Sequence, residues 1–483
     1  MFREISFDID NTLYSTDVEV KAYNEVVNFL KNETPLINAT ITTIIEAKEK
    51  AKLRVPNTRN RLFYFKELSL SLTQVKKCYS IYWTTFLKNM NLAKGTSEFL
   101  NLLKSKNVKL SCVTDFTLKE QLEKLDVLNV LDYFDNIITS EEKACEKPCL
   151  SMFLSPKDGL LIGDDYNKDI LGAKNAGWAS IHIDSSQNFT VSQNHLVFQS
   201  MNDINDFFSE YFMAIEKVVY LSKKVGERID LIQAGGGNIS CKFSFKGQRF
   251  MVIKSSGICL ADVNFFNGHT LVCEKGNVIF GTKPSIETSM HWACDKDIVI
   301  HCHPKEIVVE SLATNFLLPY IEPGEELAKA VKNFKSNQII TLTNHGIIFQ
   351  YNHSENLSIQ TLDNFLLSEQ KYRKCNELSD KFGGLVKISQ HSDQFIKLKS
   401  QYDNLCHKTF FPDFAVYCNN LIYESDAVYI KGESLRQIYQ IDEVFALHVS
   451  CCKSLKNNLK PKTIDQDKIS KRDDEKYRFG LSK

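Results

Sequence analysis

Two aspartates near the start of the chain have the spacing of a catalytic carboxylate pair. The apolar segment Arg3–Ile9 has the length of a strand, and it runs into the sequence Asp8-Ile9-Asp10-Asn11-Thr12. Side chains two residues apart at the end of a strand point to the same side, so Asp8 and Asp10 would converge. Adjacent carboxylates repel each other unless a cation relieves the repulsion. Mg²⁺, which prefers carboxylate oxygens, is the natural partner.

Three further polar segments each follow an apolar segment of strand length. Thr114 follows the strand predicted at Lys109–Val113, and its hydroxyl can bind a phosphoryl oxygen or cap a helix. Lys147, in Glu146-Lys147-Pro148, can neutralise a phosphoryl group, although a single lysine is more often a surface residue. A fourth segment follows the strand predicted at Gly159–Ile162 and carries three acids, Asp164, Asp165 and Asp169. These acids form either a metal site beside Asp8 or a solvated loop.

Together and in this order, the four segments resemble the haloacid dehalogenase superfamily of phosphatases over residues 1–212. The resemblance implies that Asp8 is the nucleophile that forms an aspartyl-phosphate, and that Asp10 is the general acid and base. It implies that Thr114 and Lys147 hold the phosphoryl group. The implied magnesium ligands are Asp8, the Asp10 carbonyl, and Asp164 with Asp165 or Asp169. The mostly helical stretch at about residues 15–100 resembles a type-one cap.

A second set of possible metal ligands lies in the C-terminal half. Residues 298–304 read Ile-Val-Ile-His-Cys-His-Pro, so His301 and His303 alternate along a strand and face the same way. His345 follows a second apolar strand, Gln338–Thr343, in the sequence Thr-Asn-His-Gly. A lone strand histidine is usually structural. Three imidazoles with an open fourth position are instead typical of catalytic zinc, and this pattern favours a Zn²⁺ site.

Segments rich in glycine and serine precede the histidines. Ala234–Ser240 contains three consecutive glycines, which would let backbone N–H groups approach an anion or would form a flexible turn. Ser255-Ser256-Gly257 follows the strand predicted at Phe250–Lys254. Lys283-Pro284-Ser285-Ile286-Glu287 precedes a helix, and Glu287 is the acid nearest in sequence to the histidine pair.

In their order along the chain, these segments resemble the class II aldolase/adducin family over residues 213–440. The resemblance implies Zn²⁺ on His301, His303 and His345. It implies that Glu287 moves the proton at the carbon beside a carbonyl that the zinc polarises. The implied phosphate-binding positions are Asn238, Ser256, Gly257 and Ser285.

The second domain departs from the sugar-phosphate aldolases of this family at two places. Ile286 sits where those aldolases often have a second serine. The stretch Leu317–Glu325 is shorter than in those aldolases, and it contains Tyr320, a candidate for the tyrosine acid that they take from a neighbouring subunit. The same zinc site also supports epimerases, decarboxylases and dehydratases such as methylthioribulose-phosphate dehydratase. Adducin is a non-catalytic interaction module that lacks the metal ligands, and the three histidines with Glu287 speak against that alternative.

The length and composition agree with two folded domains. A chain of 483 residues is too long for one hydrophobic core. Strand–helix alternation predicts an α/β fold with a Rossmann-like parallel sheet over residues 1–212. An α/β aldolase-like domain is expected over residues 213–440, with an extension or tail over 441–483. Lys+Arg and Asp+Glu both number 59, which gives no electrostatic case for binding nucleic acid or an anionic membrane.

The sequence therefore predicts a bifunctional enzyme of carbohydrate metabolism. A Mg²⁺-dependent phosphatase for a phosphorylated sugar or nucleotide is joined to a Zn²⁺-dependent aldolase for a phosphorylated ketose. No export signal and no apolar run of membrane-spanning length is seen, so a cytoplasmic enzyme is expected. Family resemblance implies a homo-oligomer, a tetramer with sites between subunits.

Overall fold

The chain folds into two compact units. The computed structural model describes residues 2–33, 39–54, 60–153, 159–312, 316–355, 359–366, 385–406, 408–423, 427–432, 435–455 and 463–464. The two units meet between Ser209 and Glu210, within the long helix α9 (Met201–Gly226). The boundary expected at residue 212 lies in the same helix. No described helix has the length and apolar composition needed to cross a membrane.

A seven-stranded sheet forms the centre of the first unit, in the order β3-β2-β1-β4-β5-β7-β6. All neighbouring strands run parallel except β6, which is antiparallel to β7. The strands are β1 Glu4–Phe7, β2 Lys109–Thr114, β3 Asn136–Thr139, β4 Leu160–Gly163, β5 Ala179–Ile183, β6 Thr190–Ser192 and β7 His195–Phe198. Apolar residues of the central strands, such as Phe7 and Ile162, are fully buried, as expected for a sheet covered on both faces. The predicted α/β class with a parallel sheet is confirmed.

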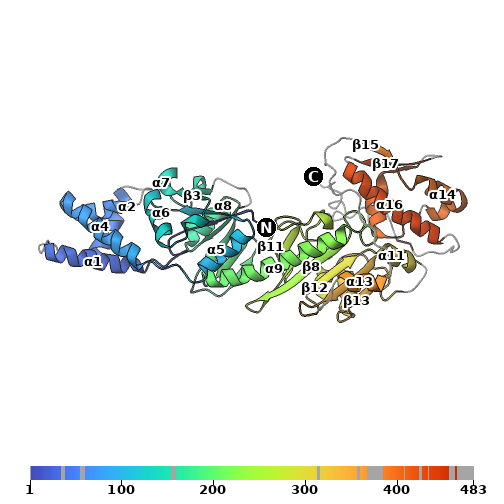
Figure 1. Ribbon diagram of the computed structural model, residues 1–483, viewed down its shortest axis with the longest axis horizontal. Helices are drawn as coiled ribbons and strands as arrows, with labels where there is room; N and C mark the ends of the chain where they lie inside the picture. The colour runs from blue at the N-terminus through green and yellow to red at the C-terminus, as the bar shows by residue number, and fades with distance from the viewer. Residues whose placement is uncertain are drawn as a thin grey trace. The chain divides into compact units, whose positions relative to one another are not determined.

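Two groups of helices complete the first unit (Figure 1). The helices around the sheet are α5 Thr96–Ser105, α6 Leu118–Val127, α7 Ser140–Lys143, α8 Leu171–Asn175 and the start of α9, with the short turns η1 Leu131–Tyr133, η2 Leu150–Phe153 and the π-helical η3 Tyr166–Ile170. The helices between β1 and α5 form a cap and are α1 Val18–Glu33, α2 Ile41–Arg54, α3 Leu62–Lys66 and α4 Leu72–Asn89. Buried rings join α1 to α4, with the Tyr23 and Tyr82 centroids 5.3 Å apart.

A buried ion pair connects the cap to the helices around the sheet. Arg61 precedes α3, and its Nη1 donates to Glu120 Oε2 on α6 at 2.7 Å. The two side chains are only 2% and 4% exposed. The Arg61 guanidinium also lies 4.1 Å from the centre of the Phe116 ring. Because burial removes water from both charges, each depends on the other for its stability.

We expect Arg61→Met to destabilise the first unit by about 3–5 kcal/mol, because it leaves Glu120 charged and buried without its cation. Urea unfolding of the full chain measures this cost. The double variant Arg61→Met/Glu120→Met should be less destabilised than Arg61→Met alone. Arg54→Met is the matched control, since the Arg54 side chain is 47% exposed in its pair with Glu67 and such pairs contribute about 0–1 kcal/mol. Equal losses for Arg54→Met and Arg61→Met would contradict the prediction.

The second unit contains an antiparallel sheet in the order β11-β10-β9-β8-β12-β14-β13. The strands are β8 Asn238–Phe245, β9 Gln248–Lys254, β10 His269–Cys273, β11 Val278–Phe280, β12 Ile298–Cys302, β13 Ile339–Leu342 and β14 Gly346–Tyr351. The associated helices are α10 Thr288–Ala293, α11 Lys305–Ser311, α12 Glu325–Lys332 and α13 Ile359–Leu366, with the turn η4 Leu260–Asp262. One buried cluster joins Met290 of α10 and Leu327 of α12 to Ile348 of β14.

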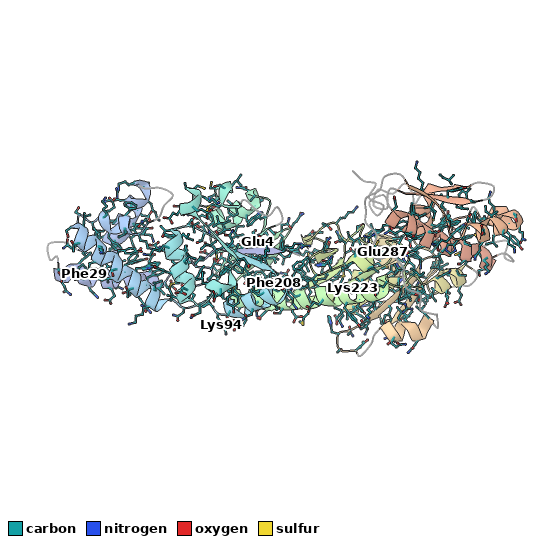
Figure 2. The ribbon with its side chains drawn as sticks, turned by 45° about the horizontal axis from the view of Figure 1, so that its top comes forward. Glu4, Phe29, Lys94, Phe208, Lys223 and Glu287 are labelled. Carbon is teal, nitrogen blue, oxygen red and sulfur yellow. The ribbon has the colours of Figure 1, made fainter. Side chains whose placement is uncertain are left out.

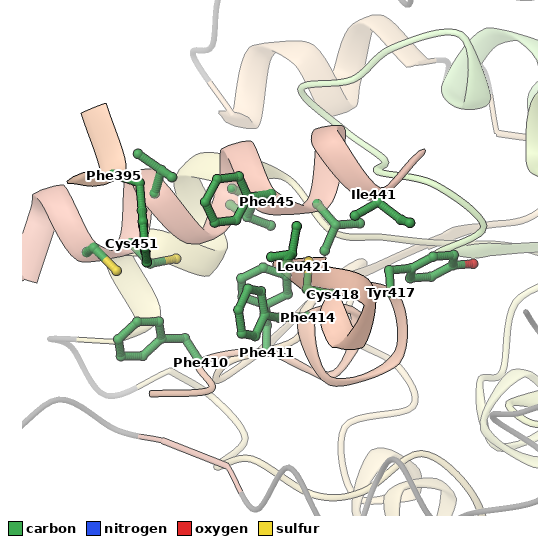
Figure 3. Close-up of a cluster of buried hydrophobic side chains, with 14 of the residues drawn as sticks. Phe395, Phe410, Phe411, Phe414, Tyr417, Cys418, Leu421, Ile441, Phe445 and Cys451 are labelled. Atoms are coloured by element: carbon green, nitrogen blue, oxygen red, sulfur yellow. The ribbon is translucent and has the colours of Figure 1, made fainter. Parts of the chain in front are cut away.

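The last described part of the second unit, which we call the C-terminal module, has its own small sheet in the order β15-β17-β16. Its elements are β15 Leu385–Ile388, α14 Ser392–Cys406, α15 Pro412–Tyr417, η5 Cys418–Asn420, β16 Leu421–Tyr423, β17 Val428–Gly432 and α16 Leu435–Leu455. Buried phenylalanines from α14, α15 and α16 form its core (Figure 3).

The extension expected to start at residue 441 differs from the structure. Helix α16 runs through this position, and its side chains Ile441, Val444 and Phe445 are fully buried in the core of the C-terminal module. Residues up to Leu455 are therefore part of a packed core, because the apolar face of α16 is covered. Of the rest of the expected tail, 456–462 and 465–483 lie outside the described residues.

Candidate active sites

Asp8, Asp164 and Asp169 form a carboxylate cluster in the first unit. Asp8 directly follows β1 and Asp164 directly follows β4, and these strands are neighbours in the sheet. Asp169 comes from the π-helical turn η3. One carboxylate oxygen from each residue lies within 4.8 Å of the others. Three hard oxygen ligands at this spacing fit a divalent cation such as Mg²⁺.

Lys147 compensates part of the charge of this cluster. Its Nζ lies 2.7 Å from Asp8 Oδ1 and 2.6 Å from Asp169 Oδ1. Burial opposes the charge of the lysine, but Asp169 and Asp8 outweigh burial and raise its pKa. Burial nevertheless raises the pKa of Asp8 well above its usual range, and burial together with Asp169 raises that of Asp164 to about 6. The cluster therefore has an excess of negative charge that a bound cation would balance.

Asp10 is held in a separate network. Its carboxylate accepts hydrogen bonds from Lys124 Nζ at 2.7 and 3.0 Å, from Gln121 Nε2 at 3.0 Å and from the Tyr14 hydroxyl. Burial opposes the charge of Asp10, but Lys124 and Arg61 outweigh burial and hold its pKa well below the usual range. Burial lowers the pKa of Lys124 to about 8, against the attraction of Asp10. Asp10 is therefore a paired carboxylate in this arrangement.

Thr114 and Asp165 have different positions relative to the cluster. Thr114 ends β2, next to β1 in the sheet, and Gln121 Nε2 donates to its Oγ1 at 2.7 Å. Asp165 instead caps the π-helical turn, since its Oδ1 accepts the backbone N–H groups of Asn167 at 2.9 Å and Lys168 at 3.0 Å. The side-chain amide of Gln121 thus links Thr114 to Asp10. The Asp165 carboxylate does not join the cluster.

The three histidines of the second unit face one another. His301 lies on β12, His303 directly follows this strand, and His345 directly precedes β14, which pairs with β12. His301 Nε2 lies 3.1 Å from His303 Nε2 and 3.3 Å from His345 Nε2. All three side chains are buried. Three imidazole nitrogens that converge in this way form a donor set that fits Zn²⁺.

Glu287, which is labelled in Figure 2, completes this group from the turn before α10. Its Oε1 lies 3.4 Å from His301 Nε2 and 3.3 Å from His345 Nε2, and its Oε2 accepts a hydrogen bond from Asn238 Nδ2 at 2.5 Å. Burial opposes the charge of Glu287, but the two histidines outweigh burial and lower its pKa. The site therefore presents a carboxylate beside the converging imidazoles, which suits proton transfer next to a metal-bound carbonyl.

The four expected phosphate-binding residues differ in their relation to Glu287. Asn238 contacts the carboxylate, and Ser285 Oγ accepts the backbone N–H of Glu287 at 3.2 Å. Ser256 is buried after β9, and its backbone N–H is bonded to a carbonyl at 2.9 Å. Gly257 follows with a left-handed φ of 76°, a conformation that favours glycine. Two of the four residues, Asn238 and Ser285, thus position Glu287 directly.

The backbone N–H groups of the glycine segment bond within the protein. The N–H of Ala234 donates to Glu443 Oε2 at 3.0 Å, and that of Gly235 donates to the Tyr417 hydroxyl at 3.1 Å. The N–H of Gly236 donates to a nearby backbone carbonyl at 3.1 Å. These groups were candidates for binding an anion, and the structure instead directs two of them to the C-terminal module.

Comparison with known proteins connects each site to a family. Residues 5–183 match the haloacid dehalogenase-like hydrolase family, and residues 216–350 match the class II aldolase and adducin N-terminal domain. The chain joins a haloacid dehalogenase-like hydrolase domain to a class II aldolase and adducin domain. Both resemblances expected from the sequence are confirmed. The carboxylate cluster lies in the hydrolase segment, and the three histidines lie in the aldolase segment.

Relatives of the hydrolase domain include two sugar-phosphate phosphatases. A ribulose-1,5-bisphosphate 5-phosphatase of Halopiger xanaduensis is 34% identical over 114 residues, which are 22% of this chain and 48% of that protein. The chain thus spans about half the length of this relative. A glyceraldehyde 3-phosphate phosphatase of Methanothermobacter thermautotrophicus is 29% identical over 199 residues, which are 38% of this chain and 87% of that protein.

Solved structures that match the chain include one that is similar to the aldolase domain. It is the N-terminal class II aldolase domain of a conserved protein from Thermoplasma acidophilum, with 26% identity and a TM-score of 0.25. The match covers 28% of this chain and 83% of that chain.

Several residues that contact the two sites were not predicted from the sequence. Lys124 and Gln121 of α6 hold Asp10 in the hydrolase domain. Asp413 and Tyr417 of α15 contact His303 and the glycine segment in the second unit. No motif marks these side chains, which come from elements distant in sequence from the residues that they contact. The tyrosine named as a candidate, Tyr320, is half-buried against the core of the C-terminal module.

Proposed function

We propose that the chain is a bifunctional enzyme of carbohydrate metabolism. The hydrolase domain would hydrolyse a phosphomonoester with Mg²⁺ through an aspartyl-phosphate. The aldolase domain would cleave or form a carbon–carbon bond of a phosphorylated ketose with Zn²⁺. The observation that carries the proposal is the pair of separate donor sets, three carboxylates in one matched family segment and three imidazoles in the other.

Asp8 is the proposed nucleophile of the hydrolase domain. Attack of its carboxylate on phosphorus would form an aspartyl-phosphate and release the alcohol of the substrate. Lys147, 2.7 Å from Asp8 Oδ1, would neutralise the phosphoryl oxygens, and the Thr114 hydroxyl would bind one of them. Asp8, Asp164 and Asp169 would hold Mg²⁺, which supplies the positive charge that allows two anions to approach each other.

Asp10 is the proposed general acid and base. Lys124 and Tyr14 donate to its carboxylate, which stabilises the charged form. That form is needed to take a proton from the water that hydrolyses the aspartyl-phosphate. In the first step, the negative phosphoryl group of the substrate would raise the pKa of Asp10 and allow it to donate a proton to the leaving oxygen.

A phosphorylated sugar is the substrate class that we propose for the hydrolase domain. The two relatives described above are named as phosphatases of sugar phosphates. Its neighbour in the chain belongs to a family for which we expect a phosphorylated ketose. A nucleotide, the other substrate class expected from the sequence, is the comparison in the test.

The proposed chemistry of the aldolase domain depends on Glu287 and the histidines. His301, His303 and His345 would hold Zn²⁺, which would polarise a carbonyl and stabilise negative charge on its oxygen. Glu287 would move the proton at the neighbouring carbon, since Oε1 faces the imidazoles while Asn238 fixes Oε2. Removal of this proton and cleavage of the next carbon–carbon bond need the same arrangement of groups.

A phosphate-release screen over sugar phosphates and nucleotides tests the proposal. It compares the wild-type chain with Asp8→Asn, with and without zinc chelation, and follows carbonyl products in the same samples. We expect release from sugar phosphates that requires Mg²⁺ and Asp8, and zinc-dependent cleavage of a phosphorylated ketose. The proposal fails for the hydrolase domain if release is unchanged in Asp8→Asn, and for the aldolase domain if the purified protein binds no zinc.

A further inference from the structure

A buried carboxylate from the C-terminal module contacts one of the proposed zinc ligands. His303 Nδ1 lies 2.6 Å from Asp413 Oδ2. The two side chains are only 5% and 2% exposed. Because a carboxylate only accepts hydrogen bonds when ionised, His303 donates its Nδ1–H, and its Nε2 lone pair is left to face His301.

The three histidines have different partners on their second ring nitrogen. His301 Nδ1 lies 2.9 Å from the Ile347 carbonyl oxygen, so the neighbouring strand fixes that ring. Within the described part of the chain, the buried His345 Nδ1 has no hydrogen-bond partner. His303 is thus the proposed ligand whose second ring nitrogen contacts a charged group. A carboxylate on the distal nitrogen fixes the tautomer and the ring orientation, and it makes the ligating nitrogen more basic.

Asp413 is held in place by the core of the C-terminal module. It lies in the first turn of α15 between Phe411 and Phe414, which are both buried. Tyr417, at the other end of α15, lies at the edge of the same core, and its hydroxyl points away from the labelled phenylalanine rings (Figure 3). The apolar side chains of α15 therefore anchor the helix, while Asp413 and Tyr417 reach the active-site segments.

The glycine segment leaves room for the contact between Asp413 and His303. A Cβ atom on Gly236 would lie 2.9 Å from Asp413 Oδ2 and 3.0 Å from His303 Nδ1, and one on Gly235 would collide with the Tyr417 hydroxyl. Glycine thus allows the loop to pass close to Asp413 and Tyr417, which a larger residue would prevent. Contacts with the C-terminal module thus explain Gly235 and Gly236.

We propose that Asp413 is a positioning residue of the metal centre and that the C-terminal module is thereby a working part of the aldolase site. The inference rests on the proposed zinc site. It extends that site to a residue beyond the matched segment, residues 216–350. Asp413 acts through His303, because its carboxylate is bonded to that imidazole and sets how strongly Nε2 binds a metal ion.

Zinc affinity of the full-length chain, measured by competition with a chromophoric chelator, tests this role. We expect Asp413→Asn to bind Zn²⁺ about 10-fold more weakly and Asp413→Ala up to about 100-fold more weakly, the range found for lost partners of metal ligands. Asparagine keeps an acceptor for the Nδ1–H but lacks the charge, whereas alanine loses both. Substitution of Co²⁺ should show a changed visible absorption spectrum in both variants, because the position and basicity of one ligand change.

Asp442→Asn is the matched control. Asp442 is a buried carboxylate of α16 in the same module, and it accepts hydrogen bonds from Ser389 Oγ and from the Gln390 backbone N–H. Wild-type affinity in both Asp413 variants would overturn the proposal, as would an equal loss in Asp442→Asn, which would assign the effect to the fold of the module. If the wild-type chain itself binds no zinc, the proposed zinc site fails instead, so the two failures are distinguishable.

Discussion

Replacement of Asp8 by asparagine is expected to reduce phosphate release by about four orders of magnitude or more, because an amide cannot form the covalent intermediate. The Asp8 carboxylate is buried, follows β1 directly and lies 2.7 Å from Lys147. The change replaces one oxygen by nitrogen and keeps the shape of the side chain. Steady-state phosphate release in saturating Mg²⁺ measures the loss.

Asp8→Asn is also expected to affect the stability of the folded chain. Burial raises the pKa of Asp8 against the attraction of Lys147, and repulsion from Asp169, Asp10 and Asp164 raises it further. A neutral amide removes this repulsion, so without Mg²⁺ the unfolding midpoint of Asp8→Asn should equal or exceed that of the wild type. Asp184→Asn is the control, since Asp184 follows β5, two strands away from β1 in the sheet, and accepts the Ser186 backbone N–H at 2.9 Å. A large loss of phosphate release in this control, or an unfolded Asp8→Asn protein, would contradict the assignment.

Replacement of His301 by alanine is expected to weaken zinc binding about 10³-fold or more and to abolish the zinc-dependent reaction. Zinc sites with four protein ligands gain roughly 10–16 kcal/mol, and about 1.4 kcal/mol is a tenfold change in affinity, so one ligand accounts for several factors of ten. His301 is fully buried, and its Nε2 lies near those of both other histidines. Metal analysis after dialysis, with the assay of ketose cleavage, measures both effects.

His353→Ala is the control for this prediction. His353 belongs to the same unit, but its ring lies beside the Lys242 carbonyl oxygen at 3.2 Å and outside the group of three histidines. It should retain wild-type zinc content. One equivalent of zinc in purified His301→Ala would show that these imidazoles do not form the binding site.

The parts of the two sites that follow strands were predictable from sequence. Asp8 and Asp164 meet because neighbouring parallel strands end at the same edge of the sheet. An apolar strand followed by an acid can be recognised in the sequence alone. His301 and His303 face the same way because side chains alternate along a strand. In such cases the alternation of side chains along a strand determines which way each side chain points.

Other contacts depend on tertiary packing and have no local signal. Asp165 was grouped with Asp164, but adjacent residues in the turn after a strand point to different places, and Asp165 became a cap. Lys124 approaches Asp10 from a helix that follows another strand. Asp413 reaches His303 from a module that the motifs do not include. The glycine segment predicted either an anion site or a flexible turn, and the same sequence also allows a helix to approach closely.

The proposed function requires two separate metal-dependent sites in one chain, of which the first is a phosphatase site. Phosphate release from a sugar phosphate in saturating Mg²⁺, measured for the wild type, Asp8→Asn and His301→Ala, tests it most directly. We expect equal release by the wild type and His301→Ala and no release by Asp8→Asn. Release that survives in Asp8→Asn, or that disappears in His301→Ala, would contradict it.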